Sequence, residues 1–321
     1  MFASAHTHVR SRRRRTGLVA TLSLAAVSVA GCGLGAGRAP SSVHLLVTRD
    51  FGATAIRSWS APRVSGAETV MSLLMRNASV STRYGGGFVE SIDGLSGGES
   101  RGQPVDWFYY VNGVEAPKGA ASTNVQPGDH IWWDRHNWSQ TDNVPAVVGS
   151  FPEPFLNGLG GKRLPVLVEC ADAASSVCGA VSVQLRTLGV PSARAALGSA
   201  GSAAKTLRVV VAPWTQARGD PTLRGIELGP RASGVYARFS ANGTSLTLLD
   251  QNGHTVRTLG AGSGLLAATR NGENAPVWVV SGTDFAGVTL AARAFDGATL
   301  QSHFAVAVSA AGAQPLPAAP G

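Results

Sequence analysis

The chain has 321 residues, of which 14% are charged and 44% are hydrophobic, with 40 glycines and 17 prolines. This is the composition of a turn-rich globular protein with room for two ordinary domains, and it excludes an intrinsically disordered chain. The formal net charge is +8, but five arginines lie at positions 10 and 12–15, and without them +3 remains. Since no basic stripe follows, we expect no nucleic-acid partner.

The first 31 residues are typical of a signal peptide that is removed on export. The arginines up to Arg15 are followed by an apolar stretch over residues 17–30 and then by Val29-Ala30-Gly31-Cys32. Small residues before a cysteine form the bacterial lipobox, so we expect Cys32 to carry the lipid that anchors the mature protein to the outer face of the cell membrane. The alternative is an uncleaved transmembrane helix, but the strongly apolar part is shorter than the ~20 residues of a membrane span.

Export would place the two remaining cysteines in an oxidising compartment. Cys170 and Cys178 form an even pair, and we therefore expect a disulfide between them, with two buried free thiols as the alternative. Neither cysteine has a histidine near it, and no cluster of His, Cys, Asp and Glu shows the spacing of metal ligands. The sequence predicts no metal site.

Strand and helix patterns follow a short lipidated tether over residues 32–42 and continue to residue 144. Residues 44–49 alternate like a strand, and a helix is expected from Gly66 to Asn77, because apolar residues recur there at three- and four-residue spacing. Short strands separated by glycine-rich turns are expected at residues 87–92, 106–111 and 129–134. One helix among four or five short strands is an α+β arrangement.

Five motifs make this region similar to a known family. In chain order they are Gly66-Ala67-Glu68-Thr69-Val70, Gly87-Phe88-Val89-Glu90-Ser91-Ile92-Asp93-Gly94, Trp107-Phe108-Tyr109-Tyr110-Val111-Asn112-Gly113, Gly119-Ala120 and Gly128-Asp129-His130-Ile131-Trp132-Trp133. Residues 43–138 thereby resemble the transcobalamin C-terminal-like β-grasp domain of bacterial lipoproteins. The resemblance implies a β-grasp domain, over residues 43–144, that binds a ligand or a partner without catalysis. In transcobalamin-type proteins this domain closes over one face of cobalamin.

Aromatic side chains near the end of this domain are the candidate ligand contacts. Strand alternation sends Trp132 and Trp133 to opposite faces, so that one indole points outward, where it would either stack on a flat ligand or pack against the helix or the second domain. A single imidazole is weak evidence for a cobalt ligand, so His136 is a candidate contact rather than a predicted metal ligand. The candidate ligand-binding residues are Tyr109, Trp132, Trp133, His136 and Trp138.

The pattern of apolar residues changes in the second half of the chain. A linker rich in proline and glycine is predicted over residues 145–163. Apolar runs at residues 164–169, 207–212 and 277–280 then alternate with helical stretches, which predicts an α/β domain over residues 164–310 with a mixed or mostly parallel sheet. Within it, Asn252-Gly253 predicts a hairpin. The Pro- and Ala-rich tail, residues 311–321, is expected to be disordered.

Three short strings resemble functional motifs but lack the right surroundings. Gly94-Leu95-Ser96-Gly97-Gly98 fits G-x-S-x-G without the strand before it and the helix after it that a nucleophile elbow needs. Residues 262–267 fit G-x-G-x-x-A, but Asn271-Gly272 interrupts the helix that should follow. Gly282-Thr283-Asp284 lies where a strand passes into a helix, and helix N-capping explains it best. We expect no catalytic residues and no enzyme.

The sequence therefore predicts a membrane-anchored lipoprotein that binds a small molecule, such as a corrinoid or another cofactor, for delivery to a transporter. The alternative is a module that docks onto another envelope protein and has no small ligand. The resemblance covers the first half alone, so the sequence assigns no role to the α/β half.

Overall fold

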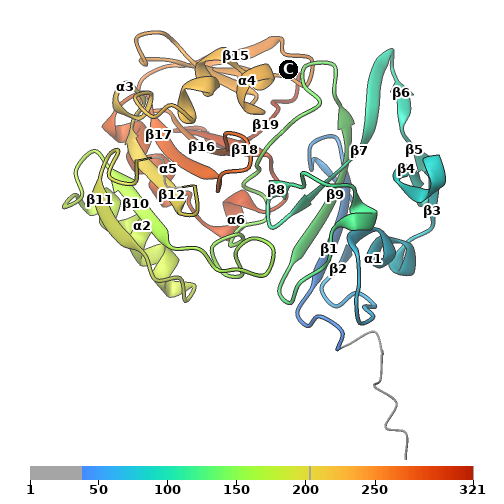
Figure 1. Cartoon of the computed structure of the whole chain (residues 1–321). Helices are drawn as coiled ribbons and strands as arrows, with labels where there is room; N and C mark the ends of the chain where they lie inside the picture. The colour runs from blue at the N-terminus through green and yellow to red at the C-terminus, as the bar shows by residue number, and fades with distance from the viewer. Residues whose placement is uncertain (1–37, 202–203, 321) are drawn as a thin grey trace, which may run out of the picture. The chain divides into compact units, whose positions relative to one another are not determined.

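The computed structural model describes residues 38–201 and 204–320 (Figure 1). The predicted signal peptide and the lipidation residue Cys32 lie outside these residues. In the described part, no helix combines the length and the apolar character that a membrane crossing requires. The described residues belong to one compact unit that contains helices and both parallel and antiparallel strands. This confirms the predicted α+β fold class.

The first half of the chain forms a six-stranded sheet. Its strands are β1 (His44–Arg49), β2 (Thr54–Trp59), β6 (Gly98–Ser100), β7 (Gln103–Val111), β8 (Val114–Glu115) and β9 (His130–Asn137). The strand order is β2-β1-β9-β7-β6, and β8 pairs with β7. Strands β1 and β9 run parallel, in a register that sets His44 beside His130. The first and last long strands of the half therefore lie side by side at the centre of the sheet.

Helix α1 (Val70–Asn77) packs on one face of this sheet. Thr69 and Ser72 form a capping box at its first turn, so the helix begins at Val70 and not at Gly66 as predicted. Its buried apolar residues join strands β1 and β9 in a common core. Near the helix lies a small sheet in the order β3-β4-β5. The small elements of this half are β3 (Val80–Arg83), η1 (Tyr84–Gly86), β4 (Phe88–Ile92), β5 (Leu95–Ser96) and η2 (Ala120–Ser122).

The second half is organised around a seven-stranded sheet. Its strands are β10 (Val166–Cys170), β11 (Ala193–Ala196), β12 (Leu207–Pro213), β16 (Gly264–Thr269), β17 (Val277–Gly282), β18 (Ala305–Ser309) and β19 (Gly312–Leu316). In the order β11-β10-β12-β17-β16-β18-β19, the first four strands pair in parallel, and each pairing from β17 to β19 is antiparallel. The sheet is mixed, as predicted. Strands β12, β16 and β17 are buried along their whole length, which explains their apolar sequences.

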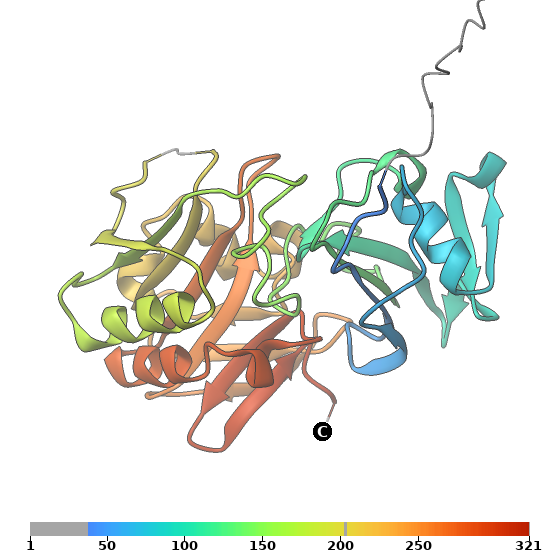
Figure 2. The ribbon, with the colours of Figure 1, turned by 90° about the horizontal axis from the view of Figure 1, so that it is seen from below.

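Three helices cover one face of this sheet, namely α2 (Ser176–Thr187), α5 (Phe285–Arg293) and α6 (Gly297–Leu300). Helices α2 and α5 lie side by side on it (Figure 2). Helix α5 approaches the sheet closely because Gly287 has no side chain, since a Cβ there would lie 2.1 Å from the carbonyl oxygen of Ser263. Asp284 caps the helix by accepting a hydrogen bond from the Gly287 N–H, at 2.8 Å. Helix capping and close packing thus account for the Gly282-Thr283-Asp284 string.

Short elements cover the opposite face. They are α3 (Trp214–Ala217), η3 (Leu223–Leu228), α4 (Pro230–Ser233), β13 (Ala237–Phe239), β14 (Leu246–Leu249) and β15 (Thr255–Leu259). The last three form an antiparallel sheet, in which β14 and β15 make the hairpin that Asn252-Gly253 predicts.

A disulfide joins Cys170, the last residue of β10, to Cys178 in helix α2, with the two Cα atoms 6.0 Å apart. This confirms the predicted pairing. The bond closes the turn between strand and helix, where Ser175 caps the helix by accepting a hydrogen bond from the Cys178 N–H.

One apolar core extends across both halves. On the face of the first sheet opposite α1, the rings of Phe51, Tyr110 and Trp132 surround Phe304, with centroids 5.1 to 5.5 Å from it. The same cluster continues to Trp214 in the second half. At Gly149 the backbone comes so close that a Cβ would lie 2.6 Å from both the Trp132 ring and the His303 backbone. The second half therefore covers the face of the first sheet that an isolated first half would expose.

Two segments that the sequence assigns to a linker and a disordered tail are packed. In residues 145–163, Phe151 and Phe155 are buried against Trp278, with ring centroids 6.0 and 4.9 Å away. Within residues 311–321, strand β19 completes the second sheet, and the Ala318 N–H donates to the Leu249 carbonyl at 2.8 Å. The prediction failed because proline and glycine also occur in irregular backbone that is buried by its neighbours.

Candidate ligand-binding site

The two tryptophans predicted as ligand contacts are buried on opposite faces of β9. Trp132 is fully buried, and its indole N–H donates to the Thr48 hydroxyl at 2.7 Å. Trp133 lies in the core beneath α1 and stacks on Tyr109, with ring centroids 4.9 Å apart. Strand alternation was predicted correctly, but helix α1 covers one face and the second half covers the other. Neither indole has a free surface for a flat ligand, so we assign the ligand contact elsewhere.

His136 belongs to a buried polar network around Asp134. The Asp134 carboxylate accepts hydrogen bonds from the Phe51 N–H at 3.0 Å and the Gly52 N–H at 2.8 Å, and also from the Thr48 hydroxyl. His136 contacts the same carboxylate through Nδ1 at 2.8 Å, with its ring stacked between Phe51 and a second phenylalanine. This network ties the loop after β1 to β9 and leaves no room for a ligand at His136.

The other two candidate contacts also lie apart from any shared site. The Tyr109 hydroxyl hydrogen-bonds Lys118 and Thr123 within its own half. Trp138 follows the end of β9 and is 39% exposed. The sequence was right that aromatic side chains gather on the last strand, but the tertiary structure uses most of them as core.

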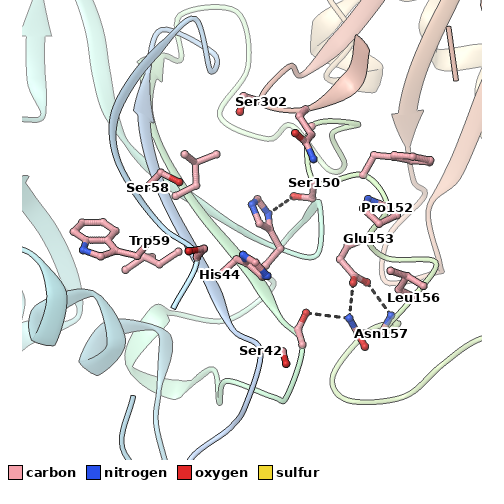
Figure 3. Close-up of a pocket in the computed structure, with 18 of the residues that line it drawn as sticks. Ser42, His44, Ser58, Trp59, Ser150, Pro152, Glu153, Leu156, Asn157 and Ser302 are labelled. Atoms are coloured by element: carbon pink, nitrogen blue, oxygen red, sulfur yellow. Dashed lines mark hydrogen bonds between the residues drawn. The ribbon is translucent and has the colours of Figure 1, made fainter. Parts of the chain in front are cut away.

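A cavity of about 630 Å³ lies at the other end of β9 (Figure 3). It is bounded by the first residues of β1 and β9, by the segment 149–157 and by the turn Gln301-Ser302. Parts of the sequence that are far apart thus meet around one space. None of the five predicted contact residues lines it. Figure 3 shows His44, Ser150 and Glu153 around this space, whereas the ring of Trp59 points away toward the core of the first half.

Two histidines form the wall of the cavity on the side of the first half. The parallel register of β1 and β9 sets His44 beside His130, with ring centroids 6.4 Å apart. His130 Nδ1 is 2.9 Å from the Ser150 hydroxyl. Burial, together with the nearby His44, lowers the pKa of His130 to about 4. Its imidazole is therefore neutral at neutral pH and serves as a hydrogen-bonding group.

Glu153 forms the opposite wall and is 5% exposed. Burial raises the pKa of its carboxyl group. The carboxylate accepts hydrogen bonds from the backbone N–H of Asn157, at 2.8 Å, and from the side-chain amide of the same residue. Both donors are neutral. The tight turn between the two residues fixes the carboxylate at the cavity wall.

A second buried carboxylate, Asp129, lies behind this wall. It accepts hydrogen bonds from the Gln126 N–H at 2.8 Å and from the Asn112 amide at 2.9 Å, and burial raises its pKa to about 6. The Asn112 amide also donates to the carbonyl of Gly158. Asn112 therefore ties the first half to the segment 145–163.

The arrangement offers hydrogen bonds and not metal ligands. Serine hydroxyls, two imidazoles, amides and one carboxylate surround the cavity. Over residues 38–201 and 204–320, no group of three or more His, Cys, Asp and Glu side chains is placed to hold a metal ion. The site is suited to binding a small polar molecule.

The sequence did carry a signal for the two histidines. His44 is the first residue of the predicted strand 44–49 and His130 is the second residue of the predicted strand 129–134, and the structure pairs these two strands in parallel, so that the histidines are neighbours. Ser150 and Glu153 had no such signal, because they lie in the stretch that we predicted as a linker. The Gly94–Gly98 string contains the two-residue strand β5 and is followed by another strand, not by a helix.

Comparison with known families covers part of the first half. A family described as "Domain of unknown function (DUF4430)", which is associated with transcobalamin-like domains, matches residues 67–137. This stretch begins just before α1 and ends with the last residue of β9. No curated protein and no solved structure matches the chain. The match includes His130 but neither His44 nor the segment 149–157.

Proposed function

We propose that the protein is an exported, lipid-anchored binding protein that holds a small polar molecule in the cavity between His44, His130 and Glu153. The observation that carries this proposal is the cavity itself. Its volume of about 630 Å³ falls within the range of about 300–1,000 Å³ that is typical of small-molecule sites. Its polar groups come from segments of both halves, so both halves would take part in binding.

The signal-peptide-like first 31 residues, followed by Cys32, support the proposed export and lipid anchoring. A signal peptide followed by Cys32 would leave the folded part on a tether of about ten residues, which spans at most about 35 Å. The disulfide between Cys170 and Cys178 fits an oxidising compartment outside the cytoplasm. A tethered binding protein of this kind would pass its ligand to transporter components in the same membrane.

The buried aromatic face changes the ligand that we propose. A corrinoid closed over by a β-grasp domain needs a free face on that domain, and here Phe304 and its neighbours occupy the face that carries Trp132. A smaller polar molecule in the cavity fits the packing better. A corrinoid is still included among the compounds in the test below.

The proposal is tested by a thermal-shift screen of the full chain, purified from membranes in detergent, against cobalamin and a panel of small polar compounds. A ligand at a hundred times its Kd should stabilise the protein by about 2.7 kcal/mol. Ser58→Trp places an indole at the rim of the cavity and should abolish the shift. Ala55→Trp, also exposed on β2 but outside the cavity, is the matched control. A shift that survives Ser58→Trp would place binding elsewhere, and a flat screen would contradict the proposal.

A second candidate function is docking to another envelope protein, and one observation favours it. Tyr84 and Phe88, at the tip of the β3–β4 hairpin, are 85% and 38% exposed and form an edge-to-face pair with centroids 6.3 Å apart. Exposed aromatic pairs are common anchors in interfaces. If this hairpin docks, Tyr84→Ser should abolish cross-linking to a specific envelope protein, while Ser58→Trp should leave it unchanged. The opposite pattern would exclude the hairpin.

A further inference from the structure

We infer that the cavity selects a ligand that carries a positively charged amine on a hydroxyl-rich body, with the Glu153 carboxylate as its counter-ion. This inference rests on the proposed function, since it names the chemical class of the ligand at the same site. It is argued from the charges around the cavity, from the partners of Glu153 and from the remaining hydrogen-bonding groups.

The charges around the cavity have one sign. Neither lysine nor arginine occurs among the described residues that line it, and Glu153 is the one carboxylate there. An anionic ligand would meet no cation and would lie beside a buried acid, which costs free energy at short range. The charge of the lining therefore disfavours phosphate and carboxylate ligands.

Glu153 has hydrogen bonds but no charged partner. Its oxygens accept from the backbone and side chain of Asn157. Burial is the main cause of the raised pKa of Glu153. The nearby Asp129 carboxylate raises that pKa further, and the positive charge of the exposed Arg163 lowers it only weakly. A buried carboxylate in this state gains from an approaching cation, because the cation compensates the lost hydration. A ligand amine would fill that role.

The imidazole of His130 does not oppose an amine near neutral pH. His130 remains neutral, because burial and the adjacent His44 lower its pKa to about 4, and its Nδ1 is engaged with Ser150 at 2.9 Å. Protonation of His130 at acidic pH would add positive charge and weaken amine binding. Amine binding should thus increase as the pH rises through the raised pKa of Glu153.

The rest of the lining explains the hydroxyl-rich body. Serine hydroxyls from β2 and from the turn at Ser302, together with the amide of Gln301, surround the space. These groups both donate and accept hydrogen bonds, so they match a ligand with several hydroxyls of its own. The ring of Trp59 points away from this space (Figure 3) and that of Phe151 is buried against Trp278, so neither offers a stacking platform.

The test compares three polyols that have the same six-carbon body and differ in charge. D-glucamine carries an amine, D-sorbitol is neutral and D-gluconate is an anion, and each is titrated calorimetrically into the full chain in detergent near neutral pH. We expect D-glucamine to bind at least about tenfold more tightly than D-sorbitol, as charged hydrogen bonds generally do, and D-gluconate to bind most weakly. Glu153→Gln should remove the preference for D-glucamine and leave D-sorbitol binding within about twofold.

A second variant covers the case in which Glu153→Gln fails to fold. Ser58→Lys adds a cation at the exposed rim and should weaken D-glucamine by about tenfold while it spares D-sorbitol. Equal affinity for all three polyols, or a preference that survives Glu153→Gln, would overturn the charge assignment but keep the cavity as a binding site. Absence of binding by all three, together with a flat screen, would overturn the binding function itself.

Discussion

The two ends of β9 place a histidine in opposite kinds of surroundings. His136, near the end of the strand, is 1% exposed, stacked between phenylalanine rings and hydrogen-bonded to Asp134. His130, at the start of the strand, opens onto the cavity and contacts the Ser150 hydroxyl. The same residue type on the same strand thus builds a core at one end and a candidate site at the other. What differs is which segment covers each end of the strand.

The stability of the covered end of β9, where His136 lies, should depend most strongly on Phe304. Phe304→Ala removes the ring that Phe51, Tyr110 and Trp132 surround, and we expect it to lower the free energy of unfolding by about 3–5 kcal/mol. Because this core is shared, both halves should still lose structure in one transition. Urea unfolding followed by tryptophan fluorescence and by far-UV circular dichroism measures both effects. Two separated transitions in the unsubstituted protein would show that the halves do not share a core.

A smaller loss of stability is expected when the buried hydrogen-bond network around Asp134 is altered. Asp134→Asn keeps the shape of the side chain but replaces one acceptor oxygen with a donor, opposite the backbone N–H groups of the loop after β1. We expect a loss of about 2–3 kcal/mol in the free energy of unfolding, because a buried donor is left unpaired. Denaturant unfolding measures it, and Asp142→Asn, in an exposed loop, is the control. A loss below about 0.5 kcal/mol would mean that the network contributes little.

At the cavity end of β9, a substitution should change how the stability of the protein depends on pH, and not how its core packs. The pKa of His130 is lowered to about 4 in the folded state, against about 6.5 when unfolded. The unfolded chain therefore binds the extra proton first, and the contribution of His130 to stability is lost as the pH falls from about 6.5 toward 4. His130→Gln should make the decline of stability over that window shallower by about 1–2 kcal/mol.

The same measurement separates the histidine from its neighbours. Asp129, whose pKa is raised to about 6, acts in the opposite direction, because the folded state binds its proton more readily and gains stability as the pH falls. The difference between the unsubstituted protein and His130→Gln removes that common contribution. An unchanged slope of stability against pH would show that His130 is hydrated and titrates normally.

Much of the local structure followed from the sequence. The strand carrying Trp132 and Trp133, the hairpin at Asn252-Gly253, the mixed second sheet and the disulfide between Cys170 and Cys178 are all found in the structure. Each depends on interactions within a short stretch, or on a periodicity that one buried face imposes. The candidate ligand contacts did not follow in this way, because exposure depends on what packs against a strand.

The sequence by itself determined the α+β class, the alternation of faces on β9 and the cysteine pairing, because local chain chemistry specifies them. Only the tertiary structure decided that the second half covers the aromatic face of the first sheet, and that the proline-rich stretch 145–163 is buried between apolar elements. The same packing brings His44, His130 and Glu153 around one cavity. Burial of one surface by another joins residues far apart in the chain, and no short sequence pattern records that contact.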